Sequence, residues 1–285
     1  MGAVRPDGLF VGLTTLDLVN YVQRFPGPDE KLEADDCWIG AGGPAANAAA
    51  TFAAMGGAAT LITALGRGDL GRLAGADLAA HGVEVIDVSV GGQLAVSSVI
   101  VDARGRRTVV SLNARGLGVQ SAPGRVAKLP VPDVIALDGH YPRLAALVLG
   151  RPGLAGVPAV LDPGNSKPRL PELMERCSHI IASSSLDDAA GADELLQRLR
   201  RHGAVLAAVT GGAGPIRTCC DGVVSKIDVP AIRAVDTLGA GDVLHGAYAY
   251  YLGAGHPPPE ALRAAAVVAA RSCEHRGPRI RRGCA

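Results

Sequence analysis

Two glycine-rich segments of the chain combine a glycine turn with a polar side chain. The later one, Asp236-Thr-Leu-Gly-Ala-Gly-Asp242, leads into a run of helix formers. Free N–H groups of Gly239, Ala240 and Gly241 and the positive end of the helix dipole would therefore converge on an anion such as a phosphate. A carboxylate at position 242 would repel that anion, so simple binding does not explain it. A catalytic role does, if the carboxylate takes a proton from a hydroxyl that attacks a phosphoryl group. The motif alone supports a simple glycine turn, with Asp242 as a helix cap, about equally well.

The earlier segment, Gly40-Ala-Gly-Gly-Pro-Ala-Ala-Asn47, adds a side-chain amide to a glycine pair. Gly42 and Gly43 lead into a helix, and Asn47 falls near its start. An amide there can both donate to and accept from vicinal hydroxyls, as recognition of a polyol requires. Asp17 stands at the end of the first predicted strand and offers a carboxylate to the same kind of ligand. A turn amide and an ordinary strand-end acid are the alternatives for these two residues.

The elements that must position these residues can be followed along the chain. Pro44 comes just after the glycine pair and starts a run of helix formers up to Met55, which predicts a helix with proline in its first turn. From Val134 onward, short apolar strands alternate with helical stretches. This alternation indicates a mainly parallel sheet covered by helices on both faces, and ligands bind such sheets where strands lead into helix N-termini. The strand-like runs Leu94–Val101 and Thr108–Leu112 predict a hairpin in a small separate sheet.

The remaining predicted elements complete this pattern. The first segment, Leu9–Val22, is β-rich and apolar, and its first strand is expected to continue into Thr14-Thr15-Leu16-Asp17. Further strands are expected at Ala59–Leu65, Val83–Val90, Val134–Leu137, Ala159–Leu161, His179–Ala182 and Val205–Val209, with a second hairpin at Ile216–Ile227. Further helices are expected at Leu70–His81, Arg143–Leu149, Leu170–Cys177, Asp187–His202, Ala240–Leu252 and Pro258–Cys273.

Composition and missing motifs exclude several classes of protein. Among 285 residues, 28 basic against 27 acidic side chains give a net charge of +1, so bulk charge favours neither a nucleic acid nor a membrane surface as partner. The six cysteines form no Cys-x-x-Cys pair, and reduced thiols in a cytoplasm are expected. The chain lacks the Gly-x-x-x-x-Gly-Lys-Ser/Thr of P-loop kinases. It also lacks a Gly-x-Gly-x-x-Gly after the first strand, so a dinucleotide-dependent dehydrogenase is disfavoured.

The order of Asp17, Gly-Gly-x-x-x-Asn47 and Asp-Thr-x-Gly-Ala-Gly-Asp242 resembles the ribokinase-like (PfkB) carbohydrate kinase family, and the likeness runs through almost the whole chain. Within the family the sequence looks most like ketohexokinase and bacterial sulfofructose kinase. The segments that carry this likeness are Val11-Gly-Leu-Thr-Thr-Leu-Asp17, Gly43-Pro-Ala-Ala, Gly105-Arg-Arg107-Thr-Val-Val and Asp242-Val-Leu-His-Gly-Ala.

The resemblance implies a fold and an assembly. The fold is a three-layer α/β/α architecture with a mainly parallel central sheet, forming one kinase domain over residues 1–285. A small β-sheet lid within it would be formed by about residues 12–38 and 92–114. Lids in this family often pair between subunits, which implies a homodimer.

The resemblance also implies roles for individual residues. Asp242 would be the catalytic base, with Gly239, Ala240 and Gly241 as the anion hole for the transferred phosphate. Sugar hydroxyls would be held by Asp17, Gly42, Gly43 and Asn47. Arg107 occupies a lid position from which it can reach substrate or phosphate, its alternative being a solvated hairpin charge. The ATP site would comprise Thr210, Gly212 and Gly214 over the phosphates and the region Ala269–Gly277 beside the adenine.

ATP and Mg²⁺ are the implied cofactors, with a monovalent cation such as K⁺ as a further candidate. The family's usual Asn-x-x-Glu, which helps to organise magnesium through water, should fall within Ile181–Leu186. The chain reads Ile-Ala-Ser-Ser-Ser-Leu there, and no acid follows before Asp187 and Asp188, so the metal ligands stay unassigned. Asp162 and Lys167 are further candidates for the nucleotide site. The C-terminal arginines are interpreted as a solvated tail, with contact to nucleotide phosphate as the alternative: Arg276, Arg279, Arg281 and Arg282.

The expected reaction is in-line transfer of the ATP γ-phosphoryl group to a primary hydroxyl of a ketose-like sugar in the cytoplasm. A nucleoside kinase of the adenosine type shares both signatures and is the alternative substrate class. Nucleoside sites usually add aromatic stacking, and the chain has only three Phe, five Tyr and one Trp, with Tyr21 and Trp38 as lid candidates. A non-catalytic descendant that binds a sugar or nucleotide is the other alternative, although binding alone does not require Asp242.

Overall fold

The computed structural model describes residues 5–165, 169–187, 189 and 191–280, and within them nine strands form one large sheet. Its order is β13-β12-β11-β10-β9-β8-β1-β4-β5, parallel from β11 to β5, with β12 and β13 added antiparallel. The inner strands are short, mostly buried apolar runs, and β8 and β9 are buried throughout, as expected for a parallel sheet covered on both faces. The strands are β1 (Asp7–Val11), β4 (Ala58–Thr63), β5 (Val83–Asp87), β8 (Val134–Leu137), β9 (Ala159–Leu161), β10 (His179–Ser183), β11 (Leu206–Gly211), β12 (Gly214–Cys220) and β13 (Val223–Ile227).

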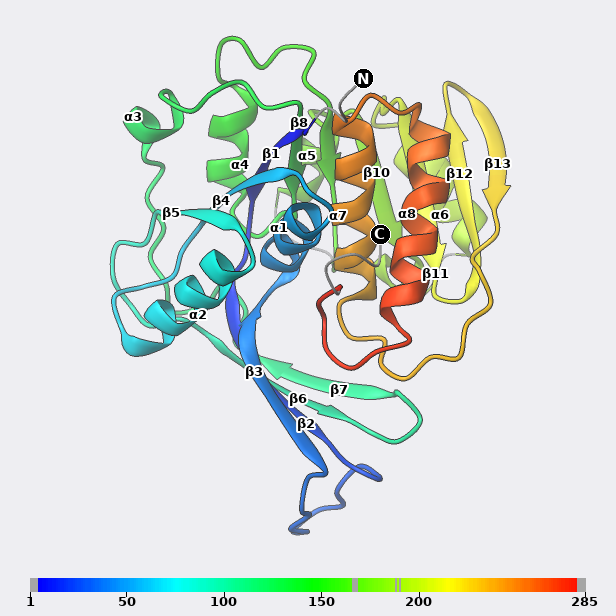
Figure 1. Ribbon diagram of the computed structural model, residues 1–285. Coiled ribbons are helices and arrows are strands. Elements are labelled where there is room, and N and C mark those ends of the chain that lie inside the picture. The colour runs from blue at the N-terminus through cyan, green and yellow to red at the C-terminus, as the bar shows by residue number, and fades with distance from the viewer. Residues whose placement is uncertain (1–4, 166–168, 188, 190, 281–285) are drawn as a thin grey trace.

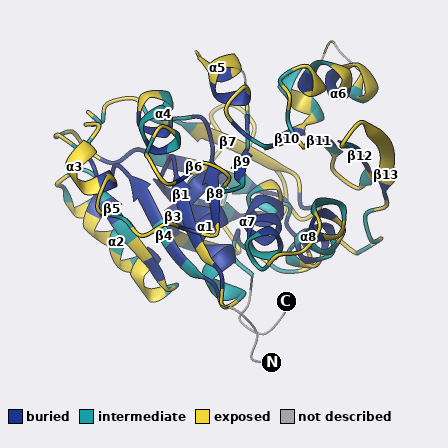
Figure 2. Ribbon diagram, turned by 90° about the horizontal axis from the view of Figure 1, so that it is seen from above, coloured by how far each residue is buried: buried dark blue, intermediate teal, exposed yellow. Residues whose placement is uncertain are grey.

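Helices cover the large sheet on both faces, and each helix layer has its own hydrophobic core (Figure 2). One layer contains α1 (Pro44–Ala54), α2 (Asp69–Ala80), α7 (Ala240–Gly253) and α8 (Pro258–Ser272). The other contains α3 (Pro123–Val126), α4 (Pro142–Leu149), α5 (Leu170–Met174) and α6 (Ala192–Arg200). None of the described helices has both the length and the apolar run needed to span a bilayer.

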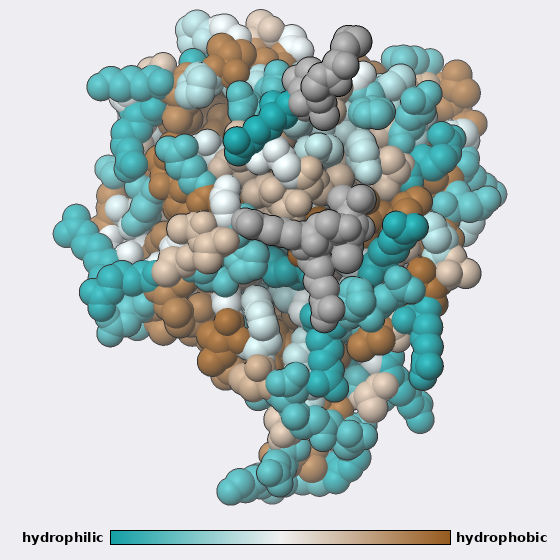
Figure 3. Space-filling model, in the orientation of Figure 1, coloured by the Kyte–Doolittle hydropathy of each residue, from teal (hydrophilic) through white to brown (hydrophobic). Residues whose placement is uncertain are grey.

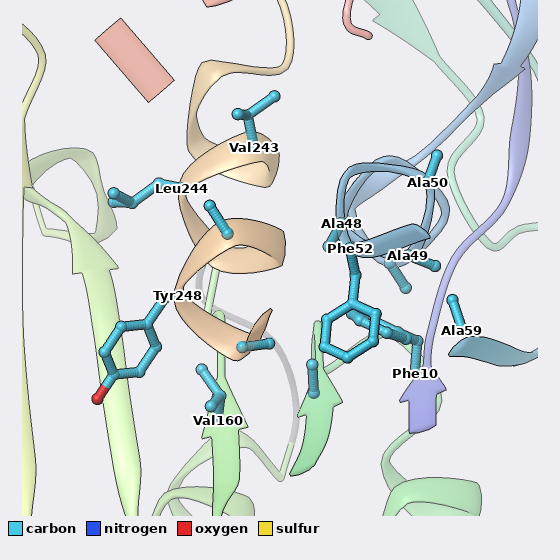
Figure 4. Close-up of a cluster of buried hydrophobic side chains, with 14 of the residues drawn as sticks. Phe10, Ala48, Ala49, Ala50, Phe52, Ala59, Val160, Val243, Leu244 and Tyr248 are labelled. Atoms are coloured by element: carbon cyan, nitrogen blue, oxygen red, sulfur yellow. The ribbon is translucent and has the colours of Figure 1, made fainter. Parts of the chain in front are cut away.

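Helices α1 and α7 pack side by side over the hydrophobic core (Figure 4), so the two glycine-rich segments that precede them come together. A Cβ on Gly246 of α7 would lie 2.3 Å from the carbonyl oxygen of Ala48 on α1, so only glycine fits there. Beneath them the rings of Phe10 and Phe52 meet edge to face, with centroids 5.3 Å apart. Small residues along the α1–α7 contact therefore determine how near their N-termini approach.

A small sheet of four strands in the order β3-β2-β6-β7 projects from the carboxyl edge of the large sheet (Figure 1). Its strands are β2 (Thr15–Tyr21), β3 (Asp36–Gly42), β6 (Val96–Val101) and β7 (Arg107–Ser111). Its inner face buries Val19, Tyr21, Val99 and Val101 in a third hydrophobic cluster. The tip of this projection is mostly hydrophilic in the view of Figure 3.

The predicted fold class is confirmed, with helices on both faces of a mainly parallel sheet and a separate small sheet. Leu9–Val22 is β-rich as predicted, but the expectation that its first strand continues into Asp17 is wrong: the chain forms β1 in the large sheet and β2 in the small one. Gly12 lies at the break, where a Cβ would stand 2.2 Å from the Asp138 carboxyl group. Asp17 therefore lies within β2, not at the end of the first strand.

Other helices and strands begin or end at residues different from those predicted, because some turn residues were interpreted as helix and some strand residues as turn. Helix α6 begins at Ala192, not at Asp187, because Asp187 ends a single 3₁₀ turn at Ser184–Leu186 and has an extended backbone, with φ of −146°. Strand β3 runs through Gly42 and so includes glycines that the sequence analysis assigned to a turn. The hairpin predicted over Ile216–Ile227 is confirmed as β12 and β13.

Candidate active site

The two glycine-rich segments meet at the carboxyl edge of the large sheet, next to the small sheet. Helix α1 begins after Gly43 and helix α7 after Gly239, and both N-termini lie at this edge beside β2 (Figure 1). Helix α7 lies over the middle of the sheet, with β11 on one side and β1 on the other (Figures 1 and 2). A ligand that extends along the edge would therefore pass the N-terminus of α7 midway.

Asp242 lies in the first turn of α7 and binds the amide of Asn47 on α1. The Nδ2 atom of Asn47 donates to Oδ2 of Asp242 at 2.7 Å. The pKa of Asp242 is raised to about 6, because burial and the acids Asp162 and Asp17 together outweigh the opposing effects of the Asn47 hydrogen bond and His245. A carboxyl group that titrates near neutrality is suited to proton transfer. The Oδ1 atom of Asn47 is buried and finds no partner among the described residues, so it can accept from a ligand hydroxyl.

Asp17 is buried on the inner face of the small sheet, with its carboxyl group against Gly42. A Cβ at position 42 would lie 2.0 Å from Oδ2 of Asp17, so a side chain there would displace the carboxylate. Thr15 donates from Oγ1 to Oδ1 of Asp17 at 2.6 Å. Burial raises the pKa of Asp17, while its hydrogen bonds and the nearby charge of Arg279 act in the opposite direction.

Gly43 is the residue that allows α1 to begin here. Its φ of +95° and ψ of 146° are disfavoured for other residues, and a Cβ would lie 2.5 Å from the carbonyl oxygen of Leu13. Asn47 donates its backbone N–H to the Gly43 carbonyl at 2.9 Å and so belongs to the first turns of α1. The glycine pair thus sets the orientation in which α1 presents Asn47.

The N-terminus of α7 forms an open cradle. Gly239 has a φ of +73°, and the helix begins at Ala240. Val243 donates its N–H to the Gly239 carbonyl, so the N–H groups of Gly241 and Asp242 have no acceptor within the helix. A Cβ on Gly241 would meet no described atom within 4 Å. Ala240 is less free, because its N–H donates to the Thr237 carbonyl at 3.3 Å.

Asp138, which the sequence analysis missed, directly follows β8 and is almost fully buried beside the site. Its carboxylate accepts the N–H groups of Leu13 at 2.7 Å and Ala45 at 3.2 Å, and His140 lies 3.2 Å away. Burial opposes ionisation, but the interactions with His140 and Leu13 prevail and lower the pKa of Asp138. An acid immediately after a buried strand is the signal that could have identified it, since Asp162, already a candidate from the sequence, directly follows β9 in the same way.

Arg279 overturns the interpretation of a solvated C-terminal tail. Its side chain is only 11% exposed, and it donates to the carbonyls of Ala41 and Ala46 and lies 3.4 Å from Asp77 of α2. The C-terminal segment thus ties β3, α1 and α2 together beside the site. Pro278 of the same segment packs on Gly239, where a Cβ would lie 2.7 Å from the proline ring. Arg281 and Arg282 lie outside the described residues.

The β6–β7 hairpin contacts the loop that precedes α7. Arg107 donates from Nη1 to Oγ1 of Thr237 at 2.7 Å and is otherwise exposed. Tyr21 of β2 donates its hydroxyl to Asp236 at 2.9 Å, and the guanidinium of Arg276 lies over the Tyr21 ring at 4.7 Å from its centroid. The small sheet and the α7 cradle are therefore linked by direct polar contacts.

The residues expected around a nucleotide lie in two places. Thr210, Gly212 and Gly214 belong to the end of β11 and the turn into β12, where Gly212 has a φ of +64° and open space around it. Ala269 lies on α8, partly buried against the core. Gly277 donates its N–H to Asp236 at 2.9 Å, so it lies against the loop before α7.

No dedicated metal site is formed by the part of the chain that the structure describes, where no group of three His, Cys, Asp or Glu side chains comes together. In the segment that replaces Asn-x-x-Glu, the hydroxyls of Ser183 and Ser185 bind each other at 2.8 Å. Asp187 forms an ion pair with Arg198 at 2.6 Å. Asp162 lies at the end of β9 close to Asp242, whereas Lys167 and Asp188 lie outside the described residues.

Comparisons with known proteins agree with this arrangement. The model of the pfkB family of carbohydrate kinases matches residues 7–122 and 157–282. The chain is 24% identical to mouse ketohexokinase, covering 94% of this chain and 96% of the relative, and 25% identical to mouse ribokinase, covering 85% and 80%. It is also similar to a structure described as a putative ribokinase from Agrobacterium tumefaciens, at 29% identity and a TM-score of 0.87, covering 97% of this chain and 94% of the other.

The match of the family model to most of the chain agrees with the fold and with the pairing of Asp242 and Asn47 between two glycine-led helices. Members of the family are phosphotransferases that act on sugar hydroxyls. This protein belongs to the pfkB family of carbohydrate kinases.

Proposed function

We propose that the protein transfers the γ-phosphoryl group of ATP to a primary hydroxyl of a ketose-like sugar, with Asp242 as general base. The single observation that carries the proposal is the position of Asp242. Its carboxyl group is bound by Asn47 on one side, lies at the open N-terminus of α7 on the other, and has a pKa raised to about 6. A group so placed can accept a proton from a hydroxyl while the helix N-terminus receives phosphate oxygens.

In the proposed step, the sugar hydroxyl loses its proton to Asp242 as its oxygen bonds to the γ-phosphorus. The bond from that phosphorus to the bridging oxygen breaks, and ADP leaves with the electron pair. Asp17 and the free Oδ1 of Asn47 would orient the sugar hydroxyls. The N–H groups at Gly241 and Asp242 would receive the charge that develops on the phosphoryl oxygens.

The nucleotide would lie on the β11 side of the edge and the sugar on the β1 side. The glycine turn after Thr210 offers exposed backbone for the approach of phosphates, and Arg107 stands over the loop before α7. Mg²⁺ would accompany ATP through phosphate oxygens and water, as it commonly does in kinases. The segment Ile181–Leu186 supplies no carboxylate for it, so no step is routed through the metal.

The carboxylate of Asp236, in the loop before α7, is poorly suited to bind a monovalent cation. This carboxylate accepts the N–H groups of Leu238 and Gly277 and the hydroxyl of Tyr21, and a cation would have to displace these donors. We therefore propose that turnover is similar in sodium and potassium buffers.

A sugar is favoured over a nucleoside by the scarcity of free aromatic faces. The Tyr21 hydroxyl is bound to Asp236 and its ring is covered by Arg276. Trp38 lies across Gly40, whose partner in the sheet is Asp17, so one aromatic ring borders the position of the acceptor. A single ring suits a pyranose or furanose face, whereas a base held between two aromatic rings would need a second.

The test is ADP release from Mg-ATP with ketoses, aldoses, modified sugars and nucleosides as acceptors, beside the Asp242→Asn variant. We expect a signal with a ketose that falls by about 10²–10⁴-fold in the variant, the usual scale for loss of a general base. A nucleoside signal would keep the mechanism and change the substrate class. Equal turnover in the variant would refute the role of Asp242.

We also propose a homodimer formed through the outer face of the small sheet. On this face the sheet register aligns Ile39, Leu18, Ser98 and Val110. Ile39 and Val110, on the two edge strands of this sheet, are 55% and 69% exposed, an unusual display of large apolar side chains on one face. Ile39→Glu with Val110→Glu should convert a dimer to a monomer in light scattering, whereas Val224→Glu on β13, also exposed, should not. A wild-type monomer at all concentrations would refute the proposal.

The described cysteines are all free, which supports the expected cytoplasmic location.

A further inference from the structure

A buried histidine lies one helical turn after Asp242, and both of its ring nitrogens face carbonyl oxygens. Nδ1 of His245 is 2.8 Å from the carbonyl oxygen of Gly241, and Nε2 is 2.9 Å from that of Ile181 on β10. A carbonyl oxygen only accepts hydrogen bonds, so both nitrogens must donate. A neutral imidazole carries one N–H and would turn a lone pair toward one of these oxygens. The geometry is therefore satisfied only by the imidazolium form.

A counter-ion is present for this charge. Oδ2 of Asp162, at the end of β9, lies 3.7 Å from Nδ1 of His245. Both side chains line a small cavity under the N-termini of α1 and α7, and Asp138 lines it too. Burial lowers the pKa of His245, but Asp162, the two carbonyls and Asp242 outweigh it and leave the pKa above its ordinary value. The acids that surround the ring are thus Asp162 and Asp242, with Asp138 across the cavity.

A second buried histidine shows what the same ring does without these partners. His179 on β10 places Nδ1 2.8 Å from the hydroxyl of Ser178, and its Nε2 has no partner among the described residues. Burial lowers its pKa to about 4, so His179 is neutral at pH 7. The two histidines are both buried, and the groups around them, not burial itself, separate their charge states.

We propose that His245 is a permanent imidazolium, paired with Asp162, that keeps Asp242 ionised at neutral pH. This inference rests on the proposed function, in which Asp242 must be unprotonated to accept the hydroxyl proton. The need for such a charge follows from the surroundings of Asp242, where burial and the acids Asp162 and Asp17 favour the protonated form, while the Asn47 hydrogen bond and the charge of Arg279 act with His245 to favour the ionised form. His245 is a positioning residue: it acts on Asp242 by charge and not by contact with the sugar.

The charge state can be tested in the unliganded protein, without turnover. Selective ¹⁵N labelling of histidine and a titration from pH 5.5 to 9 would report both ring nitrogens of each histidine. We expect His245 to show two protonated nitrogens at pH 7.5 and His179 to show one, with His245→Gln and His179→Gln used to assign the signals. A neutral His245 ring at pH 7 would overturn the proposal.

The effect on Asp242 can be measured directly as well. A ¹³C-carboxyl titration of aspartate, assigned with Asp242→Asn, should give a higher pKa for Asp242 in His245→Gln than in the wild type, by about one unit or more for loss of a nearby opposite charge. An unchanged pKa in a folded His245→Gln protein would overturn the proposal. His179→Gln is the matched control, since it removes a buried but neutral ring.

If the protein is a kinase as proposed, the same shift should appear in its pH profile. The acid limb of the kcat/KM profile should shift to higher pH in His245→Gln. The loss of kcat/KM relative to the wild type should then be about tenfold larger at pH 6 than at pH 8.5, while His179→Gln leaves the acid limb in place. A loss that is equal at every pH would indicate a purely structural role and refute the charge effect. If no acceptor supports turnover, the proposed function fails, whereas the two titrations still decide the state of His245.

Discussion

Replacing Asp242 by asparagine is expected to stabilise the fold while it lowers turnover. The pKa of this carboxyl group is raised from 3.8 to about 6, so the folded chain binds a proton more tightly than the unfolded chain does. Stability from such a group is fully present below pH 4 and is lost as the pH rises through 6. Asparagine has the same shape, carries no charge, and can still accept the hydrogen bond from Asn47 through Oδ1.

The size of the effect follows from the same numbers. The interval from 3.8 to about 6, at about 1.4 kcal/mol per unit, gives on the order of 3 kcal/mol. Because the side chain is half-buried, water screens part of the charge. We therefore expect the free energy of unfolding of Asp242→Asn to exceed that of the wild type by about 1–3 kcal/mol at pH 8. In a chain of this size that is a rise in Tm of about 2–10 °C.

The assay is urea unfolding of both proteins at intervals from pH 4 to pH 8, beside turnover at pH 8. The difference in free energy of unfolding should be near zero at pH 4 and grow toward pH 8. Glu84→Gln, which removes an exposed carboxylate on β5, controls for the loss of one negative charge and should change little. A variant that is equally stable at pH 8, or a difference independent of pH, would refute the argument that the site strains the ionised form of Asp242.

Two further predictions concern the neighbours of this residue. Asn47→Ala removes a hydrogen bond to a charged group, worth about 1.5–3 kcal/mol. The pKa of Asp242 should rise by about 1–2 units, and the acid limb of the kcat/KM profile should shift to higher pH by the same amount. An acid limb that stays in place would contradict the role given to the 2.7 Å contact. Gly246→Ala places a methyl group 2.3 Å from the carbonyl oxygen of Ala48 and should cost about 1–3 kcal/mol in urea unfolding, while Gly124→Ala, with open space around it, should stay within about 0.5 kcal/mol. Equal effects of the two alanines would refute the close approach of α1 and α7.

Much of the fold could be predicted from local sequence patterns, because each strand and helix of a parallel sheet is encoded within a single short segment. The predicted strand Val134–Leu137 has the same first and last residues as β8, and the helix predicted to start at Pro44 is α1. Both could be predicted because a buried strand and a proline-led helix are determined by neighbouring residues. The end of the first strand was predicted wrongly for a related reason. Nothing local to Gly12 indicates that Asp138 fills the space beside it and that the chain leaves one sheet for another there.

The sequence by itself determined the family, the two glycine-led helices and the residue types at their N-termini, because these depend on short motifs in a fixed order. Only the tertiary structure decided how these groups are charged and paired. The contact of Asn47 with Asp242 joins residues 195 positions apart, and the two carbonyls that face His245 come from its own helix and from β10. Arg279 likewise became a buried tie and not a solvated tail. Charge and burial arise from what surrounds a group in space, and in a parallel sheet those surroundings are assembled from strands far apart in the chain.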